Sequence, residues 1–304
     1  MKFSVEPWAP EYGVAAGTDM DETTAPPTLD VEVPEAEWAP IAPKREPVDT
    51  VLFVDGVRRV DANVWVVQED GTALLGVCAS YAAGAVRADG RAEVVDATVE
   101  RGLFTSAPDA QAITTRSAEY TVRAAVGESP EDLWLAMQQR MGELEGVVAI
   151  RHEGAELVVA DGPLRSGQHH PAAVGYIKTH HVHYLPPELR PILGELQAGQ
   201  RTPVFLSTTH WSRFMWYLRL PGPVGHPLAG VVRLEASADQ APAPAIELAD
   251  RVCATLPRFA SHEHKDPRAP QNLYPIGGLE RELRRRLGDQ RLLYRDLRAA
   301  QPRS

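Results

Sequence analysis

The strongest constraint on the fold is a pattern that the sequence contains twice, a run of apolar residues that ends in Asp-Gly. The first run is VLFVDG at Val51–Gly56, and the second is LVVADG at Leu157–Gly162. Runs of four apolar residues are typical of strands that are buried on both faces. We therefore expect Asp55 and Asp161 at the ends of two neighbouring core strands. There they would lie close enough to share one divalent cation, because hard cations take oxygen ligands.

The alternative interpretation is that these stretches are ordinary turns, since Asp-Gly is common in tight hairpins. The chain holds two further pairs, Asp70-Gly71 and Asp89-Gly90, and both follow polar or charged residues, as solvent-facing turns do. Only Asp55 and Asp161 follow four-residue apolar runs. This contrast favours a functional pair.

The charge of the chain is unevenly distributed over its 304 residues. Of the net charge of −10, residues 1–50 carry −8, with eleven acids and three bases, whereas residues 279–304 carry eight arginines against four acids. We expect residues 1–49, rich in Pro, Glu and Ala, to form an extended or partly disordered acidic arm. The arm is either a solubilising tail or a segment that docks through Trp8 or Trp38.

The rest of the chain, residues 50–304, is long enough to form one large domain with a basic helical C-terminus. No apolar stretch approaches the ~20 residues of a membrane span. The N-terminus lacks the apolar core of a signal peptide, and the two cysteines lie far apart. These features predict a cytoplasmic protein that neither spans a membrane nor depends on disulfides.

The order of the expected elements predicts an α/β protein with a mixed sheet. An antiparallel meander of three or four strands comes first. Helices at 108–126 and 129–145 follow, then strands at 157–160 and 173–178. After these, helices and strands alternate, and two basic helices at 279–287 and 290–300 are separated by Gly288. This is also the element order of the ribonuclease-H-like fold, which carries metal-binding aspartates on its first and fourth strands.

Five short motifs, taken in order, resemble those of the NurA nucleases over about residues 50–287. They are Val54–Gly56, Asp161–Leu164, Gly175–Lys178, Tyr217–Leu220 and Tyr274–Pro275. The resemblance implies a ribonuclease-H-like, Mn²⁺- or Mg²⁺-dependent nuclease that cuts DNA as an exonuclease or a single-strand endonuclease. It also implies a homodimer that works with a HerA-type hexameric ATPase in the processing of DNA double-strand breaks.

Three positions depart from the family pattern. Val57 and Pro163 stand where the family usually has serine, and Ile276 follows Tyr-Pro where the family supplies a histidine. Glu280 is the candidate that could replace this ligand. The departures leave open a second function, that of a catalytically weak relative that binds DNA or a HerA-type translocase as an assembly module.

Two-metal hydrolysis of a phosphodiester needs more carboxylates than two aspartates supply. We expect the third from Glu119, in the predicted helix at 108–126, in an Arg-x-x-Glu setting that resembles the family's. The alternative for Glu119 is a solvated glutamate on a helix surface. Glu143 and Glu145 lie nearer Asp161 in the sequence, but near the far end of the next predicted helix.

The remaining candidates are basic and aromatic residues. Lys178 follows an apolar strand and could hold a phosphate as a point charge. Arg213 and Arg219 flank an aromatic stretch that includes Trp216, a mixture suited to single-stranded DNA, although a buried core strand would show the same alternation. The family motif adds Tyr274 to the predicted DNA contacts.

Overall fold

The computed structural model describes residues 25–152, 154–164, 171–180, 182–209, 211–222 and 228–301. It confirms a mixed α/β fold with a ten-stranded sheet in the order β4-β5-β3-β2-β1-β6-β7-β10-β9-β8. No helix among the described residues is long and apolar enough to cross a membrane. The strands are β1 (Val51–Val67), β2 (Ala73–Ala88), β3 (Ala92–Thr105), β4 (Ile113–Thr114), β5 (Glu119–Ala124), β6 (Leu157–Asp161), β7 (Ala173–Ile177), β8 (Phe205–Ser207), β9 (Arg213–Arg219) and β10 (Val231–Ser237). The helices are α1 (Pro130–Arg151), α2 (Ile192–Glu195), α3 (Pro242–Thr255), α4 (Tyr274–Arg286) and α5 (Gln290–Ala299), with 3₁₀ turns η1 (Glu35–Glu37) and η2 (Leu256–Phe259).

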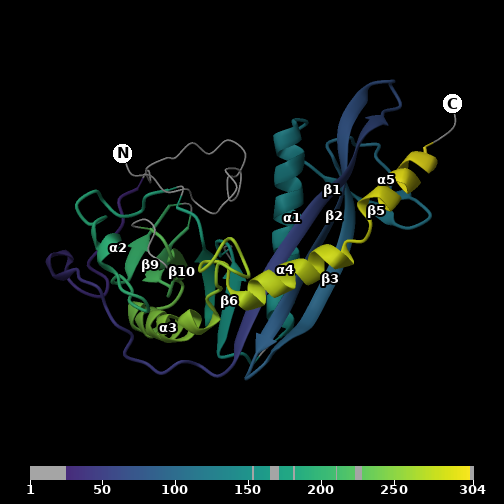
Figure 1. The fold of residues 1–304 in the computed structure, drawn as a ribbon. Helices are drawn as coiled ribbons and strands as arrows, with labels where there is room; N and C mark the ends of the chain where they lie inside the picture. The colour runs from purple at the N-terminus through teal and green to yellow at the C-terminus, as the bar shows by residue number, and fades with distance from the viewer. Residues whose placement is uncertain are drawn as a thin grey trace, which may run out of the picture. The chain divides into compact units, whose positions relative to one another are not determined.

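The contacts divide the chain into two compact units, and each is described by itself. Unit 2 contains most of β1, β2 and β3 together with β4, β5, α1 and the C-terminal helices (Figure 1). Unit 1 contains β6 to β10, α2, α3 and the first residues of β1. By residue, unit 1 comprises 1–53, 87–93 and 153–277, and unit 2 comprises 54–86, 94–152 and 278–304.

The antiparallel meander predicted for the start of unit 2 is confirmed as β1, β2 and β3. Its two turns contain Gly71 and Gly90, whose φ angles of 85° and 88° are conformations that glycine adopts without a steric cost. One detail differs from the prediction. The stretches expected as two strands, 51–54 and 62–68, are one continuous strand, β1. Asp55 therefore lies inside a strand rather than at its end.

The prediction of a helix at 108–126 is wrong, because this segment forms β4 and β5. β5 pairs in parallel with β3 and antiparallel with β4. Its residues alternate as a strand requires, with Glu119 exposed and Tyr120 buried. The Tyr120 hydroxyl donates to the buried carboxylate of Asp61, and Leu297 of α5 packs in the same apolar cluster. These tertiary contacts outweigh the weak local preference of the segment.

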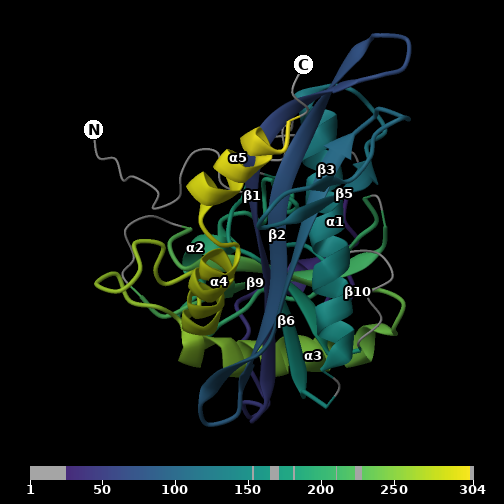
Figure 2. The same ribbon diagram turned by 90° about the vertical axis from the view of Figure 1, so that its right-hand side faces the viewer.

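Helix α1 begins as predicted and extends six residues further than expected. Ser129 is the N-cap, Pro130 is the first helical residue, and Ser129 and Asp132 form a capping box. The buried side chains of the helix recur every three or four residues and include Leu133, Met137 and Met141, so one face packs on the strands of unit 2. Figures 1 and 2 both show α1 running along these strands.

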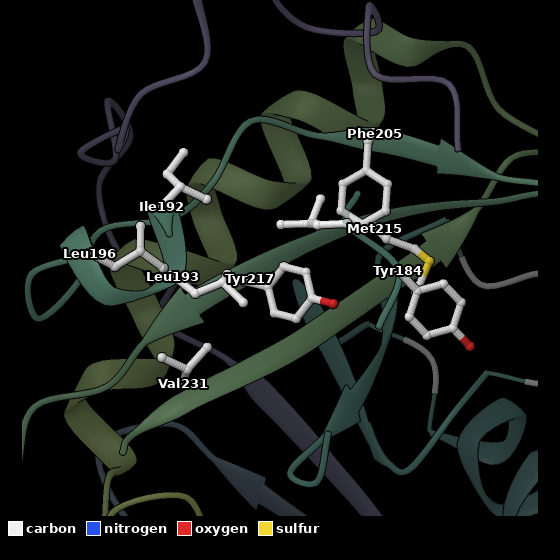
Figure 3. Close-up of a cluster of buried hydrophobic side chains, with 9 residues drawn as sticks. Tyr184, Ile192, Leu193, Leu196, Phe205, Met215, Tyr217 and Val231 are labelled. Carbon is white, nitrogen blue, oxygen red and sulfur yellow. The ribbon is translucent and has the colours of Figure 1, made fainter. Parts of the chain in front are cut away.

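Unit 1 has a sheet with apolar layers on both faces. Along β9 the side chains alternate, so Met215 and Tyr217 share one face and Trp216 points to the other. On the first face they join a cluster with Phe205 and with Ile192 of α2 (Figure 3). On the second face α3 packs against β9, with Cys253 beside Trp216.

The described part of the acidic arm is docked on unit 1. Thr28 forms both hydrogen bonds of an antiparallel bridge with Leu206 of the edge strand β8. The Glu32 carboxylate binds both terminal nitrogens of the buried Arg201 at 2.7 Å. Trp38 packs against Phe205, with the ring centroids 6.0 Å apart. Trp8 lies outside the described residues.

Candidate functional site

Asp55 is a buried carboxylate in strand β1, within unit 2. Its side chain is 7% exposed, and its Oδ1 accepts a hydrogen bond from the backbone N–H of Gly56 at 2.7 Å. The strand continues for twelve residues beyond Asp55. Gly56 is therefore not a turn residue, and its lack of a side chain has another cause.

That cause is Glu145, which reaches β1 from α1. A Cβ on Gly56 would lie well under 3.0 Å from Glu145 Oε1 and 3.0 Å from Met141 Cγ. Glycine at residue 56 therefore lets a second carboxylate approach the backbone next to Asp55. The sequence prediction placed Glu145 too close to a helix end to contribute. The helix runs on to Arg151, and Glu145 lies four residues after the buried Met141.

Asp161 ends β6, as the sequence predicts. The next residue, Gly162, has a φ angle of 109°, which favours glycine, and forms two backbone hydrogen bonds with Tyr176 of the parallel strand β7. The chain thus turns sharply after Asp161. The carboxylate of Asp161 accepts a hydrogen bond from Lys178 Nζ at 2.6 Å.

Lys178 is buried, with 4% of its surface exposed. Its ammonium group also donates to Asn272 Oδ1 at 2.8 Å, and Asn272 Nδ2 donates to Asp266 Oδ2 at 2.6 Å. Burial alone would raise the pKa of Asp266, but hydrogen bonds from Asn272 and Arg268 lower it below its ordinary value. Lys178 is thus part of a buried polar network. Asn272 and Asp266 were not found from the sequence, since no motif surrounds them.

Asp55 and Asp161 belong to different units, so the prediction that they share a cation stays a prediction. Glu119 does not join Asp55, because the order β5-β3-β2-β1 separates their strands by two others, or about 14 Å at 4.7–4.9 Å per strand. Glu119 is exposed. Glu280 forms an ion pair with Arg284, one turn further along α4, at 2.9 Å.

Strand β9 is a core strand, the alternative that the sequence left open for its aromatic and basic residues. All seven residues of β9 are buried, and Trp216 is 0% exposed, so no base can stack on its ring. Arg213 lies 3.5 Å from the buried carboxylate of Glu235, and Arg219 donates to the carbonyl oxygens of Ala229 and Leu193. These arginines bind groups within unit 1 rather than phosphates.

Tyr274 is the one predicted DNA contact whose ring reaches the surface, with 37% of the residue exposed. Its ring stacks on His262 with an interplanar angle of 19°, and its hydroxyl lies 2.9 Å from His262 Nδ1. Lys265 Nζ lies 5.4 Å from the centre of the ring. This arrangement leaves the prediction open.

The Asp55 and Glu145 carboxylates lie on opposite faces of β1, because consecutive side chains of a strand alternate and a Cβ on Gly56 would point at Glu145. They therefore do not form one cation site. Within the described ranges, no three His, Cys, Asp or Glu side chains form a group that could hold a metal ion. Asp55 by itself offers the oxygen ligand that Mg²⁺ takes, since this ion keeps several waters and binds one or two carboxylates together with substrate phosphates.

Comparison with known proteins identifies no family. No family model matches the chain, and no curated protein matches it.

Proposed function

We propose that the protein is a metal-dependent deoxyribonuclease that hydrolyses phosphodiester bonds in DNA end processing. The observation that carries this proposal is the carboxylate of Asp55, which is buried inside β1, the first strand of the meander. The order of elements also supports a ribonuclease-H-like fold, since the meander β1–β2–β3 is followed by α1 and then β6. The motifs that resemble NurA nucleases point to the same chemistry.

Mg²⁺ or Mn²⁺ bound by Asp55 would polarise the phosphodiester and lower the pKa of an attacking water. The chain would fix this ligand, because Asp55 lies inside the long strand β1. In unit 1, Lys178 holds the Asp161 carboxylate in one orientation.

The test is cleavage of single- and double-stranded DNA by the purified chain with Mn²⁺ or Mg²⁺. Asp55→Asn should lose about 100-fold or more in rate, since a bound metal supplies several kcal/mol of transition-state stabilisation. Glu119→Gln is the matched control and should cleave like the parent. Full activity of Asp55→Asn, or inactivity of the parent with both metals, would contradict the proposal.

A second candidate function is a weakly active module that binds DNA or a HerA-type hexameric translocase. The observation in its favour is that Lys178 neutralises Asp161 and Arg284 neutralises Glu280, two of the predicted metal ligands. This function predicts complex formation with such an ATPase and unchanged binding by Asp55→Asn. Co-elution of the two proteins measures it, and the mass of the free protein by light scattering tests the implied homodimer.

A further inference from the structure

The helix border that carries Glu145 also carries an aromatic residue paired with a cation. On α1, Trp134, Gln138, Met141 and Glu145 follow one another at spacings of four, three and four residues, so they lie on one stripe of the helix. Met141 is buried, whereas the other three are partly exposed. The stripe therefore forms the border between the packed face of α1 and solvent.

Strand β1 meets this stripe at two points. Gly56 and Arg58 are two residues apart and share one face of the strand. Glu145 approaches Gly56, and the Arg58 guanidinium lies 4.5 Å from the centre of the Trp134 ring. Such a distance is typical of a cation–π pair. The rise of 1.5 Å per residue places Trp134 about 16 Å along the helix from Glu145.

We propose that Arg58 and Trp134 form a binding subsite for single-stranded DNA, on the border of α1 and on the strand that carries Asp55. The inference rests on the proposed function and adds to it the residues that hold the substrate. An indole ring and a guanidinium plane both stack on nucleic-acid bases, and the positive charge attracts the phosphate backbone.

The chemistry of the pair defines the kind of DNA that it takes. A stacking surface needs a base whose face is free, which a single strand offers throughout and a duplex only at its ends. Every base has such a face, so the subsite reads no sequence. It replaces the β9 residues, which are buried, as the aromatic and basic contact with DNA.

The test is the binding of a fluorescently labelled twenty-residue oligothymidylate, followed by anisotropy in EDTA so that no cleavage occurs. Trp134→Ala should lose roughly tenfold or more in affinity, the effect of one stacked base. Trp134→Phe should keep most of the affinity, because phenylalanine also stacks on a base. Arg58→Ala should weaken binding. It should also reduce the slope of log affinity against log salt concentration by about 0.7, because each phosphate contact on a single strand contributes about that much to the slope.

Trp65 provides the matched control, because it is also a tryptophan of unit 2 and is 70% exposed, on β1. Trp65→Ala should bind like the parent. Equal losses in Trp65→Ala and Trp134→Ala, or parental affinity in Trp134→Ala, would overturn the proposal. The melting temperature of each variant separates a loss of binding from a loss of folding.

The outcomes also separate this inference from the proposed function. If Asp55→Asn abolishes cleavage while Trp134→Ala binds the oligonucleotide like the parent, the subsite is wrong and the nuclease stands. If the parent binds through Trp134 but cleaves with neither Mn²⁺ nor Mg²⁺, the subsite stands and the nuclease is wrong.

Discussion

The two Asp-Gly stretches look alike in the sequence but differ in what surrounds each carboxylate. In unit 2, Asp55 lies inside a long strand, and a second carboxylate, from Glu145, reaches the neighbouring residue. In unit 1, Asp161 ends its strand, and the ammonium group of Lys178 binds it at 2.6 Å. One carboxylate lies inside a strand, and the other is held by an ion pair at a strand end.

The difference shows that an apolar run ending in Asp-Gly specifies a buried strand and a carboxylate, but not the function of that carboxylate. The function depends on which side chain another element brings to it. For Asp161 this side chain is Lys178, at the end of β7, whereas Glu145 of α1 approaches the opposite face of the strand that carries Asp55. An internal ion pair mainly fixes geometry, whereas a carboxylate oxygen is a ligand that hard cations take.

The largest effect on stability is expected from Lys178→Met. The change leaves the Asp161 carboxylate without its lysine and removes the donor to Asn272, and breaking a buried pair in this way costs about 3–5 kcal/mol. Urea unfolding measures the loss as a lower midpoint. Arg251→Ala is the control, because its ion pair with Glu247 is exposed and should contribute less than about 1 kcal/mol.

A double variant sharpens this prediction. Asp161→Asn combined with Lys178→Met should cost less than the sum of the single changes, because neither partner is then left as a buried charge. Strict additivity would show that the ion pair contributes no coupling, and the contrast between the two Asp-Gly sites would then fail.

Gly56→Ala is expected to change activity more than stability. The new methyl group would displace Glu145 Oε1, which lies at the end of a flexible side chain, so the stability cost should be about 1 kcal/mol. A shift of the β1 backbone, which also carries Asp55, should reduce metal-dependent cleavage about tenfold or more. Parallel measurements of cleavage rate and urea midpoint check both parts.

Gly278→Ala in α4 is the matched control, since a Cβ there meets nothing within 4 Å. This variant should keep parental activity. Its free energy of unfolding should rise by up to about 1 kcal/mol, because alanine favours a helix more than glycine does. Parental cleavage in Gly56→Ala would mean that the approach of Glu145 to β1 has no functional role.

The parts of the fold that could be predicted are those specified by adjacent residues. Asp70-Gly71 and Asp89-Gly90 form the turns of the meander, and Ser129-Pro130 begins α1, because turn and cap chemistry act over two to four residues. The segment 108–126 has no such signal. Its strands depend on pairing with β3 and on the distant Asp61, which no local pattern reveals.

The same limit applies to the site. Both aspartates could be identified because the apolar runs are local, and Asp161 at a strand end was correct. Glu145 was missed because the glycine it approaches lies on another element. β9 could be interpreted either as a core strand or as a basic aromatic surface, and Trp216 shows that it is core. Position within a folded sheet decides such cases, and composition does not.

The smallest effect is expected in the acid stability of unit 1. Asp266 is held as a carboxylate by Asn272 and Arg268, so its pKa in the folded protein lies below its value in the unfolded chain, about 3.9. A group of this kind contributes stability that is fully present above the unfolded pKa. The contribution is lost as the pH falls through the folded pKa, because the unfolded state then binds more protons.

Asp266→Asn removes this titration while keeping one oxygen that can accept from Asn272. The free energy of unfolding of the parent should therefore fall more steeply below about pH 4 than that of the variant. Urea unfolding at a series of pH values measures the two slopes. Their difference reports on Asp266, because the contributions of the carboxylates that both proteins share cancel. Equal slopes would mean that Asp266 does not titrate with folding. In that case packing rather than charge would hold Asn272 and Asp266, the two residues that continue the network from Lys178. The contrast with Asp55 in unit 2 would then rest on the Asp161–Lys178 ion pair alone.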